Sequence, residues 1–120
     1  MKSLFCMFCT LAIASSVSAQ ETGNAMLKYG LNFLKTPYVA HTLEVNEEEK
    51  LVVNFDEVDC TTFVEYVLAL SLSPVKNGAI DKTDYARVLQ KIRYRDGRIN
   101  GYTSRLHYIA DWVNNGVRHG

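Results

Sequence analysis

Four blocks of apolar residues recur at helical spacing along the chain, and each predicts an amphipathic helix. The first block covers residues 25–34 and ends before Thr36-Pro37, a pair that breaks helices. The second block follows Asp59, a residue that can cap a helix, and stops at Ser73-Pro74. Its apolar face is so broad that we expect this helix to be buried. The members of that face are Phe63, Val64, Val67, Leu68 and Leu70.

The other two blocks lie in the second half of the chain. Asp81 or Thr83 can cap the third predicted helix, which Asp96-Gly97 ends with a turn. The fourth follows Ser104 and is closed by Asn115-Gly116. We expect three large residues of this last helix to lie in the core: Tyr108, Ile109 and Trp112.

Strand signals are few and weak. Residues 38–45 alternate loosely, and residues 51–55 form a short β-branched run, so each predicts at most a short strand or an extended loop. The chain is therefore a helical layer that looks like part of a larger α+β design. We expect the apolar face around Phe63, Val67 and Leu70 to lack a covering sheet and to form a large exposed patch.

The first 19 residues read as an export signal. Lys2 supplies the positive start, residues 4–13 the apolar stretch, and residues 17–19 a small-residue cleavage site. The mature chain then has 101 residues, which is enough for one small domain, and it is expected in the periplasm or the medium. Because Cys6 and Cys9 lie inside the apolar stretch and no longer apolar run follows, we expect neither a lipid nor a membrane anchor.

Charge and metal-ligand spacing narrow the function further. The mature chain has 12 Lys and Arg against 13 Asp and Glu, so no basic field attracts nucleic acid or anionic lipid. The acidic run at residues 47–49 is typical of a solvated face. His41, His107 and His119 do not have the spacing of zinc ligands, and we expect no metal and no cofactor. The expected state is a monomer.

Cys60 is the one thiol left after removal of the export signal, in a compartment that oxidises thiols. It follows Asp59 directly, at the start of the second predicted helix, where unpaired amides favour the thiolate form that attacks carbonyls. The alternative is a structural one, with Asp59 as an ordinary cap and Cys60 as a small buried hydrophobe. This pattern predicts a nucleophile at Cys60.

Five ordered stretches together resemble one protein family: TPYVAHTLE (36–44), LVVNF (51–55), DCTTFVE (59–65), IRYRDG (92–97) and GYTSRLHYIADW (101–112). The family is the N-acetylmuramoyl-L-alanine amidase-like group of exported bacterial cysteine hydrolases, in the NlpC-type, papain-like superfamily. The resemblance covers nearly all of the mature chain and places Cys60 on the family's nucleophile helix. It implies an α+β fold, of which this chain holds mainly the helical N-terminal part, residues 20–120.

The resemblance also implies an activity and a partner. The family's reaction is hydrolysis of the amide between the lactyl group of N-acetylmuramic acid and L-alanine, in muropeptides or peptidoglycan fragments. The Cys60 thiolate would attack the carbonyl, a His would protonate the leaving amine, and water would clear the thioester. The backbone amide of Cys60 is a candidate donor to the oxyanion.

The identity of the general base stays open. In hydrolases of this type the base His follows on a strand of the central sheet, which this chain does not show, so the chain resembles the N-terminal part of the enzyme. Within the chain, His107 and Asp111 are four residues apart on a predicted helix and could form a triad with Cys60. The other interpretations place Ser104, Arg105 and His107 along the substrate cleft, or make His107 a packing residue.

Two further residues match the motif that precedes the nucleophile. Tyr38 and Thr42 fit a sugar-binding position, although a Tyr after Pro is often a packing residue, and Asp59 is a third candidate substrate contact. Lys35 and His41 depart from the family pattern. Two functions without chemistry compete with the amidase: an inactive, truncated remnant that at best binds muropeptides because it lacks the base His, and a small periplasmic binding module.

Overall fold

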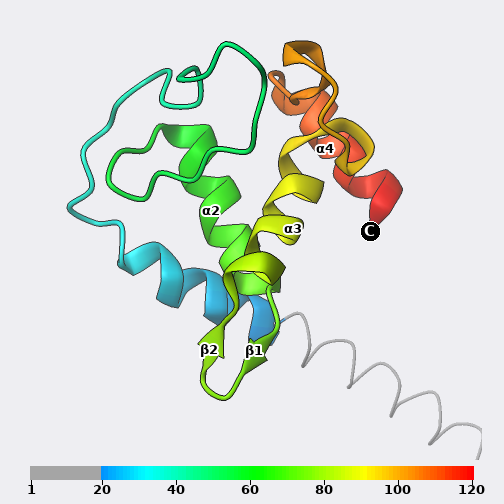
Figure 1. Ribbon diagram of the computed structural model, residues 1–120. Helices are drawn as coiled ribbons and strands as arrows, with labels where there is room; N and C mark the ends of the chain where they lie inside the picture. Colours follow the sequence, from blue (N-terminus) through cyan, green and yellow to red (C-terminus); the bar gives the residue numbers. More distant parts are fainter. Residues whose placement is uncertain (1–19) are drawn as a thin grey trace, which may run out of the picture.

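The computed structural model describes residues 20–120, and the predicted export signal lies outside the described residues. The described part of the chain starts with helical residues 20–31 and continues through a long loop into α2 (Cys60–Leu72). A small hairpin, β1 (Val75–Lys76) and β2 (Ala79–Ile80), leads into α3 (Lys82–Arg93). Two short 3-10 turns, η1 (Arg95–Gly97) and η2 (Tyr102–Ser104), precede α4 (Ile109–His119) (Figure 1). The described residues are thus mostly helical with one two-stranded sheet, consistent with an α+β fold.

The start of α2 is the predicted one. The Asp59 carboxylate accepts a hydrogen bond from the backbone N–H of Thr62 at 2.8 Å, and the Thr62 hydroxyl accepts one from the backbone N–H of Asp59 at 2.9 Å. This reciprocal cap satisfies two amides that a helix start otherwise leaves unpaired. The helix ends where Ser73 leaves helical geometry ahead of Pro74, which has no N–H to continue it.

The connection between α2 and α3 is a β-hairpin. Val75 pairs with Ile80 across it, and Asn77-Gly78 forms its tip with φ of 53° and 77°. Two consecutive positive φ values suit Asn-Gly best, which explains the tight connection. The carboxylate of Asp81, and not Thr83, then caps α3.

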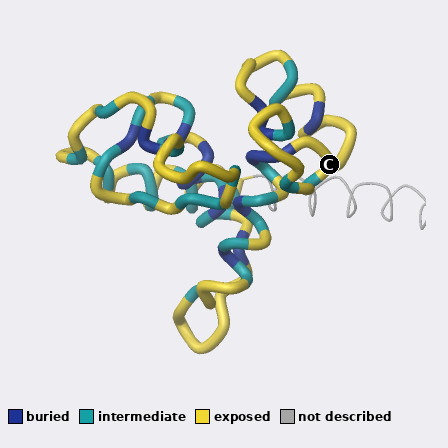
Figure 2. Tube along the Cα trace, turned by 45° about the horizontal axis from the view of Figure 1, so that its top comes forward, coloured by how far each residue is buried: buried dark blue, intermediate teal, exposed yellow. Residues whose placement is uncertain are grey.

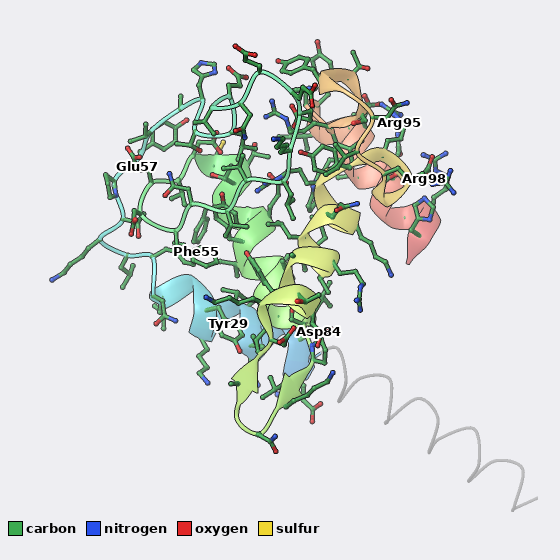
Figure 3. The ribbon with its side chains drawn as sticks, in the orientation of Figure 1. Tyr29, Phe55, Glu57, Asp84, Arg95 and Arg98 are labelled. Atoms are coloured by element: carbon green, nitrogen blue, oxygen red, sulfur yellow. The ribbon has the colours of Figure 1, made fainter. Side chains whose placement is uncertain are left out.

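The core lies where α2, α3 and the long loop meet. Val58, Tyr66, Ala69, Tyr85 and Leu89 are its buried members. Phe55 comes from the loop and lies beside α2, 5.2 Å from the Tyr66 ring and 5.7 Å from the Tyr85 ring (Figure 3).

The expected exposure of the α2 face is therefore wrong. Val67 is only 4% exposed, and Phe63 and Leu70 pack against the core as half-buried residues. The physical reason is that the long loop covers α2 without forming a sheet. A single parallel bridge between Tyr38 and Val58 ties its two ends together, with the Val39 N–H donating to the Val58 carbonyl at 3.0 Å.

A buried ion pair joins α2 to α3. Arg93 Nε lies 2.9 Å from Glu65 Oε2, and both side chains are almost completely buried. The same guanidinium donates to the Val52 carbonyl and faces the Tyr66 ring at 5.4 Å. Burial is the largest single influence on the pKa of Arg93 and lowers it, but the interactions with Glu65 and Tyr66 together outweigh burial and raise that pKa. The pair thus fixes the loop as well as the two helices.

The last helix differs from its prediction at both ends. It begins at Ile109, because the Ser104 hydroxyl closes a turn instead of capping a helix: it accepts from the Asn100 N–H and donates to the Gly101 carbonyl. It runs through Asn115-Gly116, since Asn115 is buried and accepts a hydrogen bond from the Asp96 N–H.

The expected core positions on α4 are also wrong in part. Tyr108 and Ile109 are 74% and 71% exposed, while Trp112 is half-buried. Figure 2 shows that much of the trace near the C-terminus is exposed. Within residues 20–120, no helix is long and apolar enough to cross a membrane.

Candidate active site

Cys60 occupies the first position of α2 and its side chain is exposed. Its sulfur lies 3.9 Å from the Thr61 hydroxyl. The Asp59 carboxylate accepts a hydrogen bond from the backbone N–H of Thr62. Within the described residues, the backbone N–H groups of Cys60 and Thr61 donate no hydrogen bond. Two free donors beside an exposed sulfur are what an attacking thiolate and a developing oxyanion require.

Two pockets meet at Cys60, and we name them by what they contact. The α4-side pocket has a volume of about 270 Å³, and besides Cys60 it is lined by Thr61, Val64, Leu106, His107, Tyr108, Ile109 and Trp112. The Tyr38-side pocket has a volume of about 290 Å³, and besides Cys60 it is lined by Gly30, Phe33, Leu34, Thr36, Tyr38, Val58, Asp59 and Phe63. The thiol therefore lies at the junction of a two-part cleft.

His107 shares the α4-side pocket with Cys60, but no hydrogen bond joins the two in the described structure. Its Nε2 is 2.9 Å from the Tyr102 carbonyl oxygen, and its ring packs on the Tyr102 ring at 4.3 Å. A carbonyl only accepts, so the proton of neutral His107 is assigned to Nε2, which leaves Nδ1 as an acceptor.

The expected partnership of His107 with Asp111 is not formed. His107 precedes α4 instead of lying on it, so the four-residue spacing does not place the two on one helix face. The Asp111 carboxylate faces Arg95 at 3.9 Å. The Tyr102 carbonyl takes the orienting position that the prediction gave to Asp111.

The remaining predicted site residues divide into two groups. Tyr38 lies at the cleft, 71% exposed, so it is not the packing residue that its place after Pro suggests. Asp59 also lines the cleft, although its Oδ1 serves the helix cap. Thr42, Ser104 and Arg105 line neither Cys60 pocket.

Arg105 belongs to a buried network that the sequence did not indicate. Its Nε lies 2.9 Å from Glu49 Oε1, and its Nη2 lies 3.8 Å from Glu44 Oε1. The pair with Glu49 is an ion pair and not a hydrogen bond, because the Nε–H of Arg105 does not point at the carboxylate oxygen. Tyr94 donates its hydroxyl proton to Glu49 at 2.7 Å, and burial together with that bond raises the pKa of Tyr94. Glu49 is 7% exposed, so the acidic run is not wholly solvated.

Comparison with known proteins identifies the family of the chain. The sequence model of the family described as AmiA-like, N-acetylmuramoyl-L-alanine amidase-like, matches residues 28–119. The chain belongs to this family. No curated protein matches it. In the described part of the chain, no group of three or more His, Cys, Asp or Glu could hold a metal ion.

Solved structures agree with this family. An N-acetylmuramoyl-L-alanine amidase from Bacteroides uniformis is 64% identical, with a TM-score of 0.77 over 79% of this chain and 40% of the amidase. A Bacteroides fragilis protein provisionally named a xylanase is 62% identical, with a TM-score of 0.74 over 78% of this chain and 40% of its own. Protein LPG0564 from Legionella pneumophila shares the fold, with 21% identity and a TM-score of 0.70 over 91% of this chain and 36% of its own. The chain spans about 40% of the length of the amidase structure it matches.

Proposed function

We propose that the chain carries the nucleophile of an exported cysteine amidase that cuts the N-acetylmuramoyl-L-alanine bond of peptidoglycan fragments. The observation that carries the proposal is the exposed Cys60 at the capped start of α2, at the junction of two pockets. Membership in the amidase-like family and the amidase from Bacteroides uniformis support it. In that role the chain acts in the periplasm or outside the cell, as a monomer.

The reaction proceeds in two steps. The Cys60 thiolate attacks the lactyl carbonyl carbon, and the oxygen takes up the negative charge, facing the free N–H groups of Cys60 and Thr61. The C–N bond then breaks, and the amine of L-alanine leaves with a proton from a general acid, so that a thioester remains on Cys60. Water then attacks the thioester and gives one proton back to the proton-transfer group; the C–S bond breaks, which restores the thiolate, and the muramic acid leaves as a carboxylate after losing its second proton to solvent.

The proton-transfer group has two candidates. The first is a His on a strand of the central sheet, the position of the base in NlpC-type, papain-like hydrolases, because in this proposal the chain corresponds to the N-terminal part of such a domain. The second is His107, which faces the cleft with Nδ1 free and with its ring oriented by the Tyr102 carbonyl. Tyr38 and Asp59 bind substrate in either case.

The residues of this cleft fit a xylanase activity, as in the name of the Bacteroides fragilis protein, less well than an amidase activity. Glycosidases use two carboxyl groups that flank the scissile bond. Among the described residues that line the two Cys60 pockets, Asp59 is the one carboxylate, and it caps α2. A thiol-based amide hydrolysis fits the residues better.

Release of L-alanine from N-acetylmuramyl-L-alanine tests the proposal. If His107 transfers the proton, the chain releases L-alanine and Cys60→Ala does not, with Val53→Ala, an exposed loop change away from the cleft, as the control. Loss of release in His107→Ala assigns proton transfer to His107, and unchanged release assigns it elsewhere. Binding of the substrate with no release of L-alanine would instead support the non-catalytic muropeptide-binding alternative.

A further inference from the structure

A short turn at residues 101–104 lies in the orange segment before α4 (Figure 1). The Ser104 hydroxyl closes this turn, because it accepts a hydrogen bond from the Asn100 N–H at 2.9 Å and donates one to the Gly101 carbonyl at 2.7 Å. Gly101 has φ of 71° and ψ of 177°, a combination essentially restricted to glycine. A Cβ atom added there would meet no heavy atom within 4 Å, so the backbone conformation alone requires glycine. One hydroxyl and one glycine therefore define the shape of the turn.

The carbonyl of Tyr102 is the point at which this turn contacts His107. Its oxygen lies 2.9 Å from His107 Nε2 and also accepts a hydrogen bond from the Arg105 N–H at 3.3 Å. The Tyr102 ring packs on the His107 ring, with 4.3 Å between the centroids. Ser104 itself lines neither pocket of the cleft, so its hydroxyl can act there only through this contact.

The segment after the turn is anchored to the end of α3. Arg105 forms an antiparallel bridge with Tyr94, and the Leu106 N–H donates to the Arg93 carbonyl at 2.9 Å. Arg105 and Leu106 are both buried. His107 follows at once, so the anchored backbone fixes the position of its Cα atom and the turn fixes the orientation of its ring.

Among the described residues that line the α4-side pocket, His107 is the one nitrogen base. The indole of Trp112 only donates, and the pocket has no carboxylate or amide side chain. Because the Tyr102 carbonyl accepts, the proton of neutral His107 is on Nε2, and Nδ1 keeps its lone pair. Nδ1 can therefore accept a proton or an N–H group at the Cys60 end of the pocket.

We propose that Ser104 is a positioning residue for His107. Its hydroxyl keeps the turn at residues 101–104 closed, and the closed turn holds the imidazole in the cleft with Nδ1 free to accept. Gly101 serves the same purpose through its backbone. Ser104, a predicted substrate contact, thus has an indirect role instead. The inference rests on the proposed function only for the use of Nδ1 in the reaction, because the orientation of the ring does not depend on turnover.

NMR of the chain with ¹⁵N-labelled histidine measures this orientation, at a pH above the ordinary His pKa of about 6.5. His107→Gln identifies the His107 signals. We expect the parent chain to show the nitrogen shifts of the Nε2–H tautomer and NOEs between the ring protons of His107 and Tyr102. In Ser104→Ala the two nitrogen shifts should move toward each other, as the tautomers mix, and the NOEs should weaken. Ser104→Thr keeps a hydroxyl and should retain the parent pattern.

Two more variants separate the turn from a general loss of structure. Gly101→Ala should reproduce the Ser104→Ala spectrum, because alanine is strained at this φ and ψ although space is open. Thr103→Ala is the matched control: Thr103 is an exposed residue of the same turn, and its hydroxyl makes no hydrogen bond in the described structure, so the spectrum should not change. A Ser104→Ala spectrum equal to the parent's, or the same change in Thr103→Ala, overturns the proposal.

Release of L-alanine connects the positioning to the reaction. Where His107→Ala loses release, Ser104→Ala should lower kcat/KM by roughly two- to tenfold, the range of one net hydrogen bond, and Ser104→Thr should restore it. A loss in Ser104→Ala with normal release by His107→Ala would show that Ser104 acts by another route, and would also overturn the proposal. If no chain releases L-alanine, the proposed function fails, and the NMR comparison still decides whether Ser104 positions His107.

Discussion

Removing one hydroxyl group should weaken the helix start that presents Cys60. Thr62 is 2% exposed, and its hydroxyl accepts from the Asp59 N–H at 2.9 Å and lies 3.0 Å from the Asp59 carboxylate. Thr62→Val keeps the shape but leaves a partly buried N–H without a partner, which costs about 1–3 kcal/mol. For a chain of this size each kcal/mol lowers Tm by roughly 4–8 °C.

Thermal unfolding followed by circular dichroism measures that loss, and the rate of Cys60 alkylation by iodoacetamide measures its effect on the site. We expect a drop in Tm of at least about 4 °C, and an alkylation rate that slows toward that of the urea-unfolded chain. Asp59→Asn is the control because Asn caps a helix as well as Asp. A Thr62→Val chain with unchanged Tm, or an equal drop in Asp59→Asn, would refute the role given to this cap.

Three further predictions concern charges away from the cleft. Arg93→Met leaves Glu65 buried without its partner and should cost about 3–5 kcal/mol in urea unfolding, most of which Glu65→Leu should recover in the double variant. The raised pKa of Tyr94 keeps its phenol neutral after the unfolded phenol ionises, so its contribution is complete below pH 10 and is lost as the pH rises further. Tyr94→Phe should therefore flatten the alkaline loss of stability. The hydrogen bond from His119 lowers the pKa of Asp96. The interaction therefore stabilises the folded state above the ordinary pKa of Asp, and this stabilisation is lost as the pH falls through the lowered value. His119→Ala should move the pKa of Asp96, followed by NMR, back toward 3.8.

Local sequence signals correctly predicted the bounds of the helix that carries Cys60. Asp59 caps α2 and the helix stops before Pro74, because both effects depend on hydrogen bonds between residues at most four apart. The place of Cys60 in the first turn of α2 was predictable for the same reason, and its role as a nucleophile stays a prediction. The family resemblance stated from the motifs is confirmed by the match over residues 28–119.

Long-range pairing could not be predicted in this way. Glu65 and Arg93 are 28 residues apart, and Tyr94 and Glu49 are 45 apart, so no spacing rule connects them. The start of α4 was misplaced because a serine caps a helix and closes a turn with the same hydroxyl chemistry, and Ser104 does the second. That error put His107 on one helix face with Asp111, whereas in the structure His107 precedes α4 and Asp111, on α4, faces Arg95.

Capture of the acyl intermediate tests the central proposal most directly. The chain is mixed with a p-nitrophenyl ester of N-acetylmuramic acid, quenched in acid, and analysed by intact and peptide mass spectrometry. The proposal predicts a mass increase of one muramoyl group, located on Cys60 and absent from Cys60→Ala. A chain that stays unmodified, or that carries the muramoyl group on another residue, would contradict it.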